Sequence, residues 1–134
     1  AQYPPLFPEA AERLKAAVRF LHQRGLEKVA IVAHSLGARM TDYFVGHNED
    51  PRIAAWVAIG LSGELTARQP SPILDVYGEH DRPAVLASAG RRAAVLRTVR
   101  RSAQVEIAAA DHFYTGREAE LVKHVSLFLD RTLK

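Results

Sequence analysis

Short apolar runs alternate with helical patterns along most of the chain, and this alternation is the feature that most restricts its fold. The runs are rich in β-branched residues, as expected for strands buried on both faces. Helical segments separate them, and parallel strands need such crossovers. We therefore expect an α/β fold in three layers, with about four parallel strands between flanking helices. The four runs are residues 28–33, 55–60, 73–77 and 105–109.

The helical segments carry their own start and stop signals. An apolar stripe predicts a first helix that ends at Gly25, a residue suited to a left-handed cap. Helical patterns follow Ser35 and Pro83, and Thr115 with Glu118 forms a capping-box signature before the last helix. No internal repeat and no domain boundary interrupts this order. We expect residues 1–134 to form a single domain.

Composition excludes several classes of protein. The 134 residues fit one domain with a modest core, and 48% of them are hydrophobic. The absence of cysteine excludes disulfides and thiolate chemistry. No apolar run reaches the length of a membrane span, so we expect no membrane association. Because the chain opens on Ala1, we expect it to be processed or cut from a longer protein. The compartment stays open.

The basic excess gathers in one segment. The formal charge is +3 and the sequence pI is about 9.5. A nucleic-acid surface is one interpretation. The same segment has apolar residues at helical spacing and no aromatic residues to stack on bases. We therefore expect its arginines to form the solvated face of a helix, and we expect no nucleic-acid partner. They are Arg91, Arg92, Arg97, Arg100 and Arg101.

A tight turn follows the first predicted strand. A serine stands between strand and helix, with small residues two positions to either side, in Ala33-His34-Ser35-Leu36-Gly37. Small neighbours let the two backbones approach closely, and the turn lifts the serine hydroxyl above the sheet. The Leu36 N–H at the helix N-terminus would face a developing oxyanion. The pattern also suits an ordinary turn with Ser35 as an N-cap.

Two later strand ends carry an acid and a histidine. The third strand runs into a Gly-x-x-Asp segment that ends at Asp81, and His112 follows the fourth strand. Together with the turn at Ser35, these segments resemble the C-terminal catalytic half of the α/β-hydrolase family. In that family a serine, an acid and a histidine follow successive strands in this order. The resemblance implies an α/β-hydrolase-like sheet, truncated at its N-terminal side, and a triad of Ser35, Asp81 and His112.

Each member of this triad has a distinct chemical task. A free serine hydroxyl is a poor nucleophile, so His112 would take its proton as general base and return it to the leaving group. Asp81 would hold the imidazole in the right tautomer and stabilise its charged form. All three residues follow the carboxyl ends of parallel strands, where open α/β sheets place their sites.

Other side chains compete for these tasks. Asp111 and Glu79 are rival acids, although Asp111 adjoins His112, and adjacent side chains usually point apart. Asp81 could also serve only as a turn residue. One conceivable metal set lacks the usual ligand spacing, so we expect no metal and no other cofactor. That set is His34, His80, Asp81 and His112.

The strands that precede the serine turn in the family have no counterpart in this sequence. A second oxyanion donor normally comes from a loop after one of them, and losing such a donor costs about 10²- to 10³-fold in turnover. Residues 28–33 would also become a sheet edge, whose free N–H and C=O groups invite pairing with another chain. We therefore predict that the chain forms a homo-oligomer or needs a missing N-terminal half.

The sequence as a whole favours a serine hydrolase that cleaves small carboxylic esters through an acyl-enzyme. Small soluble esters are favoured because no lid insertion is visible between Gly60 and Pro72. The alternative is a catalytically weak or inactive remnant of an α/β-hydrolase that acts as a binding or assembly module. The incomplete oxyanion hole supports this alternative.

Overall fold

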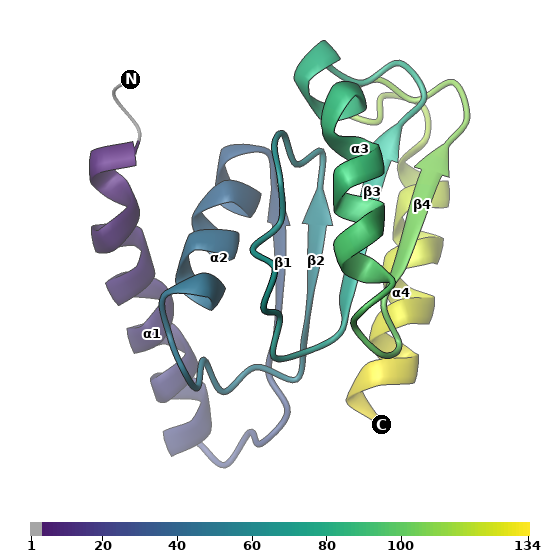
Figure 1. The fold of residues 1–134 in the computed structure, drawn as a ribbon. Coiled ribbons are helices and arrows are strands. Elements are labelled where there is room, and N and C mark those ends of the chain that lie inside the picture. The colour runs from purple at the N-terminus through teal and green to yellow at the C-terminus, as the bar shows by residue number, and fades with distance from the viewer. Residues whose placement is uncertain (1–3) are drawn as a thin grey trace.

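Four parallel strands form the central layer of the molecule (Figure 1). The computed structural model describes residues 4–134. The strands lie side by side in sequence order, so the predicted α/β class and the predicted strands are confirmed. The last strand begins two residues earlier than predicted. The strands are β1 (Ala30–His34), β2 (Ala55–Ile59), β3 (Ile73–Gly78) and β4 (Ala103–Ile107).

Helices cover the two faces of this sheet unequally (Figure 1). One face carries α1, α2 and α3, whereas α4 packs on the other face against β2, β3 and β4. The predicted three-layer arrangement is therefore confirmed. The helices are α1 (Phe7–Gln23), α2 (Leu36–Gly46), α3 (Pro83–Leu96) and α4 (Glu118–Leu133), with a short 3-10 turn at Pro4–Leu6.

One of the predicted helix signals is wrong. Gly25 follows α1 with φ +83°, as a left-handed cap requires. Thr115, however, does not cap α4, because this helix begins at Glu118 with Arg117 in the N-cap position. The Thr115 N–H instead donates to Asp111 Oδ1 at 3.3 Å. The loop before α4 therefore uses Thr115 for its own turn, which delays the start of the helix.

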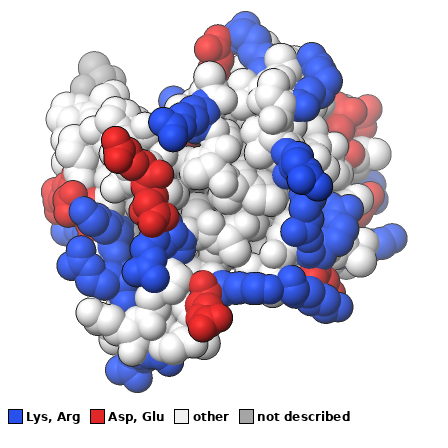
Figure 2. All heavy atoms as spheres, turned by 60° about the horizontal axis from the view of Figure 1, so that its bottom comes forward, with Lys and Arg blue, Asp and Glu red and all other residues white. Residues whose placement is uncertain are grey.

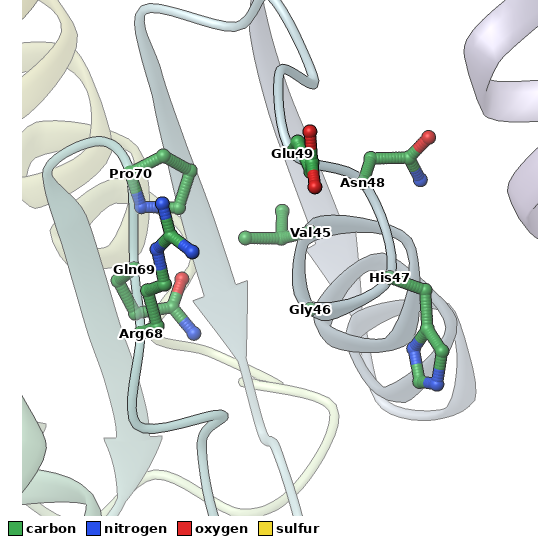
Figure 3. Close-up of a pocket in the computed structure, with 8 residues that line it drawn as sticks. All are labelled: Val45, Gly46, His47, Asn48, Glu49, Arg68, Gln69 and Pro70. Atoms are coloured by element: carbon green, nitrogen blue, oxygen red, sulfur yellow. The ribbon is translucent and has the colours of Figure 1, made fainter.

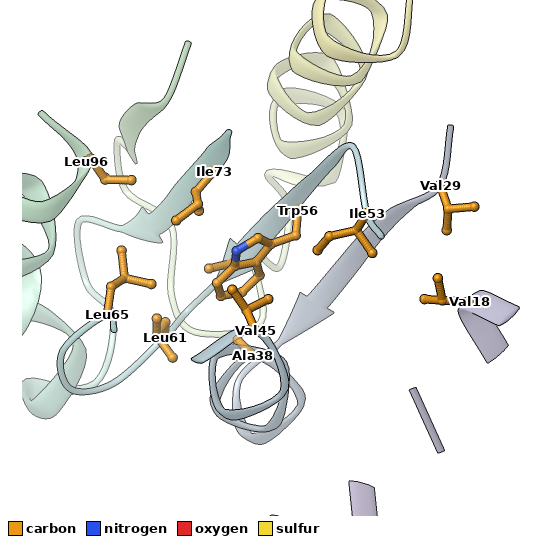
Figure 4. Close-up of a cluster of buried hydrophobic side chains, with 11 residues drawn as sticks. Val18, Val29, Ala38, Val45, Ile53, Trp56, Leu61, Leu65, Ile73 and Leu96 are labelled. Atoms are coloured by element: carbon orange, nitrogen blue, oxygen red, sulfur yellow. The ribbon is translucent and has the colours of Figure 1, made fainter. Parts of the chain in front are cut away.

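Alternating side chains along the strands build two cores. On the α2 side, Trp56 is fully buried at the centre of a cluster that joins β2 to α1, α2 and α3 (Figure 4). On the α4 side, Val57 of β2 and Phe128 of α4 belong to the second cluster. Strands β2 and β3 have buried side chains on both faces, as the apolar runs predicted. This packing on both faces fixes the positions of the carboxyl ends of β2 and β3.

Strand β1 differs from the two central strands. It is an edge strand, as predicted, and pairs only with β2 among the described residues. Its burial on both faces was a wrong prediction, because Val32 is 50% exposed on the α4 side of the sheet, where α4 packs on β2, β3 and β4. Ile31 and Ala33 pack on the opposite side against the core around Trp56. Self-association through this edge stays a prediction.

The arginine segment also departs from its prediction, because α3 ends at Leu96 and holds two of the five arginines, Arg91 and Arg92. Arg91, Arg97, Arg100 and Arg101 are exposed, but Arg92 is fully buried. Figure 2 views the end of the molecule where the strands begin, and Lys and Arg side chains flank an uncharged central surface there. None of the helices within residues 4–134 combines the length and the apolar content that crossing a bilayer requires.

Candidate active site

Ser35 occupies a strained turn between β1 and α2. Its φ of +56° with ψ of −119° is rare for a residue with a side chain. The Ser35 N–H donates to the Ile59 carbonyl at 2.8 Å, which fixes the turn to the end of β2. The interpretation of Ser35 as a simple N-cap is wrong, because its hydroxyl makes no capping bond to α2. Strain at this position keeps the hydroxyl free for another partner.

The small residues around this turn leave more room than the sequence suggested. A methyl group added at Gly37 would lie 4.0 Å from the Ala33 side chain, which is an ordinary contact. The close approach of strand and helix therefore demands a small residue at Gly37, but not a glycine. Alanine would fit there without displacing the strand.

The structure brings the three predicted site residues together at one rim of the sheet. His112 Nε2 lies 2.9 Å from Ser35 Oγ, and His112 Nδ1 lies 2.6 Å from Asp81 Oδ1. The Asp81 and His112 residues are each 5% exposed, so water is largely excluded from their contact. The imidazole therefore connects a hydroxyl to a carboxylate in one line.

The protonation of His112 follows from its partners. An ionised carboxylate only accepts hydrogen bonds, so the Nδ1–H of a neutral imidazole donates to Asp81. Nε2 is then left with a lone pair and accepts from the Ser35 hydroxyl. This is the tautomer in which the histidine can remove the serine proton.

Asp81 is held in place by the backbone of its own turn. Its Oδ2 accepts from the Gly78 N–H at 3.1 Å, and its Oδ1 also accepts from the Arg82 N–H at 2.8 Å. Gly78 itself needs to lack a side chain, because a Cβ there would lie 2.3 Å from the Ala110 carbonyl oxygen. The glycine of the Gly-x-x-Asp segment thus lets the end of β3 touch the loop that carries His112.

The two rival acids, Asp111 and Glu79, bind backbone N–H groups of the loop that carries His112, and neither of them is hydrogen-bonded to the imidazole ring. Asp111 is exposed, and its Oδ1 accepts from the Phe113 N–H at 2.9 Å and from the Thr115 N–H. These hydrogen bonds from backbone N–H groups lower the pKa of Asp111, and the one from Phe113 has the largest effect. Glu79 Oε2 accepts from the Ala109 N–H at 2.7 Å. Neither carboxylate is the hydrogen-bond partner of His112.

His34 has a contact that the sequence did not reveal. Its Nε2 lies 2.9 Å from the His112 carbonyl oxygen, and the two imidazole rings are 4.8 Å apart. His34 therefore steadies the backbone of the histidine loop. Within residues 4–134, no group of three or more histidine, aspartate or glutamate side chains is arranged to hold a metal ion.

The predicted oxyanion donor lies at the start of α2. Leu36 is the first residue of this helix, directly after Ser35. The first amides of a helix have no partner within the helix and carry the positive end of its dipole. The Leu36 N–H is thus available beside the serine hydroxyl, and its role in holding an oxyanion stays a prediction.

Gly60 and Tyr114 are two further buried residues near the candidate site. Gly60 directly follows β2 with φ +61°, and it lies against the His112 ring. Tyr114 is buried, and its hydroxyl donates to the Val76 carbonyl at 3.2 Å. Burial raises the pKa of this phenol. In the sequence, Gly60 stands out only as a glycine that follows a strand, because the residue it contacts, His112, belongs to a distant loop.

A second buried carboxylate belongs to β3 but not to this constellation. Asp75 Oδ2 accepts from Arg92 Nε at 2.8 Å and from Gln104 Nε2 at 2.8 Å. Burial raises the pKa of Asp75 above its ordinary value, and the opposing charge of Arg92 limits this effect. The Asp75–Arg92 pair is completely enclosed, so it connects α3 to the sheet out of reach of solvent.

A separate pocket lies at the far end of α2 (Figure 3). It has a volume of about 280 Å³, and its walls include Glu49 and Arg68. Ser35 precedes the first residue of α2, and the pocket takes in the last turn. Eleven residues of helix place the two about 16 Å apart at 1.5 Å of rise per residue. None of the predicted site residues lines this pocket.

Comparison with known proteins identifies similar folds. No protein-family model matches the sequence, and no curated protein does. An esterase from Pyrococcus furiosus matches with a TM-score of 0.79 at 14% identity, over 100% of this chain and 66% of its own. A putative alpha/beta hydrolase of unknown function from Agrobacterium tumefaciens matches with a TM-score of 0.70 at 20% identity, over 86% of this chain and 56% of its own.

A third similar structure is an alpha-beta serine hydrolase homologue from Coxiella burnetii. Its TM-score is 0.66 at 20% identity, over 90% of this chain and 57% of its own. The chain spans 56% of the length of the Agrobacterium tumefaciens structure and 57% of the length of the Coxiella burnetii structure. The four strands and their helices therefore have the fold of part of an α/β-hydrolase domain, and the predicted resemblance is confirmed at the level of the fold.

Proposed function

We propose that this chain carries the catalytic residues of a serine hydrolase that cleaves small carboxylic esters. The observation that carries the proposal is the position of His112, with one ring nitrogen at 2.9 Å from the Ser35 hydroxyl and the other at 2.6 Å from Asp81. Both distances lie in the range that proton transfer requires.

Each step of the reaction uses a residue of this rim. Ser35 Oγ attacks the ester carbonyl carbon while its proton passes to His112 Nε2. The carbonyl oxygen gains the negative charge and turns toward the Leu36 N–H. His112 then gives the proton to the departing alcohol, and the acyl group stays on Ser35. A water molecule then attacks the acyl carbon while its proton passes to His112 Nε2. His112 returns this proton to Ser35 Oγ as the bond from Ser35 to the acyl group breaks and the acid leaves.

The Asp81 carboxylate stabilises His112 while the imidazole ring is protonated. When His112 holds the proton from Ser35, its ring is positive, and Asp81 lies in direct contact with it. The Gly78 and Arg82 N–H groups keep the carboxylate oriented throughout. A small ester is the proposed substrate because the sequence shows no lid insertion between Gly60 and Pro72, and this segment is tied to neighbouring helices.

Labelling with a fluorophosphonate tests the proposal. This reagent reacts with an activated serine, so the native chain is expected to be labelled and Ser35→Ala is not. Ser126→Ala, an exposed serine of α4, is the matched control and should be labelled at the native rate. Equal labelling of native protein and Ser35→Ala would contradict the assignment of the nucleophile.

The second candidate is a weak or inactive remnant that serves as a binding or assembly module. The free edge of the sheet at β1, a strand that includes the half-exposed Val32, favours this alternative. Only one oxyanion donor, the Leu36 N–H, has been identified, and one missing donor lowers turnover by about 10²- to 10³-fold. A native chain that resists labelling while it remains folded would favour the remnant.

A further inference from the structure

The imidazole of His112 rests against a glycine at the end of β2. Gly60 has φ +61°, a conformation that residues with a side chain rarely adopt. A Cβ at this position would lie 2.9 Å from His112 Cε1 and 3.0 Å from His112 Nδ1. Non-bonded atoms very rarely approach a Cβ this closely, so one of the two groups must shift. A side chain at Gly60 and the observed ring position therefore exclude each other.

The backbone around Gly60 is fixed more firmly than the ring. The Gly60 N–H donates to the Val76 carbonyl at 2.8 Å, which ties it to β3. Farther along the same loop, the Gly63 N–H donates to Ser88 Oγ of α3 at 2.9 Å. Arg39 of α2 donates to the Glu64 carbonyl at 2.7 Å. Three neighbouring elements thus hold this loop in place.

The ring, by contrast, is the end of a rotatable side chain. It can turn about its side-chain torsions without breaking backbone hydrogen bonds, so it is the partner that moves when Gly60 gains a methyl group. A rotation away from Gly60 changes the positions of both ring nitrogens and so disturbs the 2.6 Å contact to Asp81 and the 2.9 Å contact to Ser35. A misplacement of about 1 Å is enough to reduce a reaction rate by about 10²-fold.

We propose that Gly60 is a positioning residue that sets where the His112 imidazole stands between Ser35 and Asp81. The inference rests on the proposed function for its effect on rate, but the contact itself is independent of any activity. The clamped loop acts as a fixed wall, and the missing side chain at Gly60 is what lets the ring reach both partners at once.

Gly60→Ala tests the proposal, with Gly25→Ala as its matched control. Both glycines have a positive φ, and a Cβ at Gly25 meets no atom within 4 Å. Both variants therefore suffer the same kind of backbone strain, but only Gly60→Ala displaces the ring. Fluorophosphonate labelling and kcat for a small ester should fall in Gly60→Ala, by up to about 10²-fold. Gly25→Ala should keep the native rate per folded molecule.

A proton NMR measurement separates this proposal from the proposed function. The short hydrogen bond from His112 Nδ1 to Asp81 should give a far-downfield proton signal in the native chain and in Gly25→Ala. Gly60→Ala should shift or lose this signal while circular dichroism shows a retained fold. An unchanged signal in Gly60→Ala, or equal rates in the two variants, would overturn the positioning role. A native chain that shows the signal but no labelling would instead refute the hydrolase assignment alone.

Discussion

Two carboxylates, one inside β3 and one just beyond its end, are both buried and both hydrogen-bonded to a side-chain nitrogen. They differ in the chemistry that this nitrogen allows. Asp75 is fully buried and lies 2.8 Å from Arg92 Nε, whereas Asp81 is 5% exposed and lies 2.6 Å from His112 Nδ1. Arginine keeps its proton at every ordinary pH, but histidine can take and return one. The far nitrogen of His112 also reaches the half-buried Ser35. Burial and pairing alone therefore do not mark a reactive site.

The largest effect is expected from Asp81→Asn. An amide in place of the carboxylate no longer fixes the tautomer of His112 or stabilises its charged form, so ester hydrolysis should fall by about 10⁴-fold. The fold should persist, because the amide oxygen still accepts from a backbone N–H. Asp111→Asn, which changes the neighbouring rival acid in the same way, should retain native hydrolysis. A similar loss in both variants would break the distinction between the two acids.

Arg92→Met should produce the opposite outcome. Removal of the cation leaves Asp75 buried without its counter-charge, which is expected to cost about 3–5 kcal/mol in the free energy of unfolding. The variant also loses the hydrogen bonds from Arg92 Nη1 to Ser88 Oγ and to the Gly63 carbonyl, but the Gly63 N–H still donates to Ser88 Oγ. The folded fraction should therefore still be labelled at Ser35. The control is Arg91→Met, since the exposed pair of Arg91 with Glu64 contributes at most about 1 kcal/mol. Urea unfolding and labelling, measured on the same samples, would decide.

The stability lost in Arg92→Met should depend on pH. Burial already raises the pKa of Asp75 above 3.8, and loss of Arg92 removes the strongest opposing influence. An acid whose pKa is higher in the folded state binds its proton more tightly there, so stability is retained at low pH and lost as pH rises. The difference from the native chain should therefore be small near pH 4 and larger near pH 7. A difference that shrinks with rising pH would contradict this view of Asp75.

The smallest effect is expected from Gln104→Ala. Gln104 Nε2 is the second donor to Asp75 Oδ2, at 2.8 Å, and it also reaches the Ala89 carbonyl at 2.9 Å. Its loss should cost about 1.5–3 kcal/mol, as for a hydrogen bond to a charged group. Ester hydrolysis should stay at the native level. A marked fall in hydrolysis would show that the environment of Asp75 influences the rim where Asp81 acts.

The candidate site was predictable because each of its members belongs to a short local pattern. Ser35 follows an apolar strand and has small neighbours, and Asp81 ends a Gly-x-x-Asp segment beyond another strand. Parallel strands bring their carboxyl ends to one edge, so local patterns at three strand ends predict a common site. The catalytic roles of Ser35, Asp81, His112 and Leu36 remain to be measured.

The wrong predictions share a physical cause. Arg92 occupies a helix whose other arginine, Arg91, faces solvent, and only the position of Asp75 on a neighbouring strand explains its burial. Thr115 matches a capping box, yet the competing acceptor Asp111 captures its N–H. Val32 lies in an apolar run, but α4 packs on β2, β3 and β4 and leaves Val32 half exposed. In each case a contact with another segment, or the lack of one, overrides the local pattern.

The amino-acid sequence alone determined the alternation of strands and helices, the parallel sheet and the residues at its carboxyl-terminal rim. These features depend on the periodicity of apolar residues and on short motifs, which are properties of neighbouring positions. Only the tertiary structure decided that Arg92 is enclosed with Asp75 and that Gly60 lies against His112. Such contacts join segments that are distant in the chain, and their distances are set by how the layers pack.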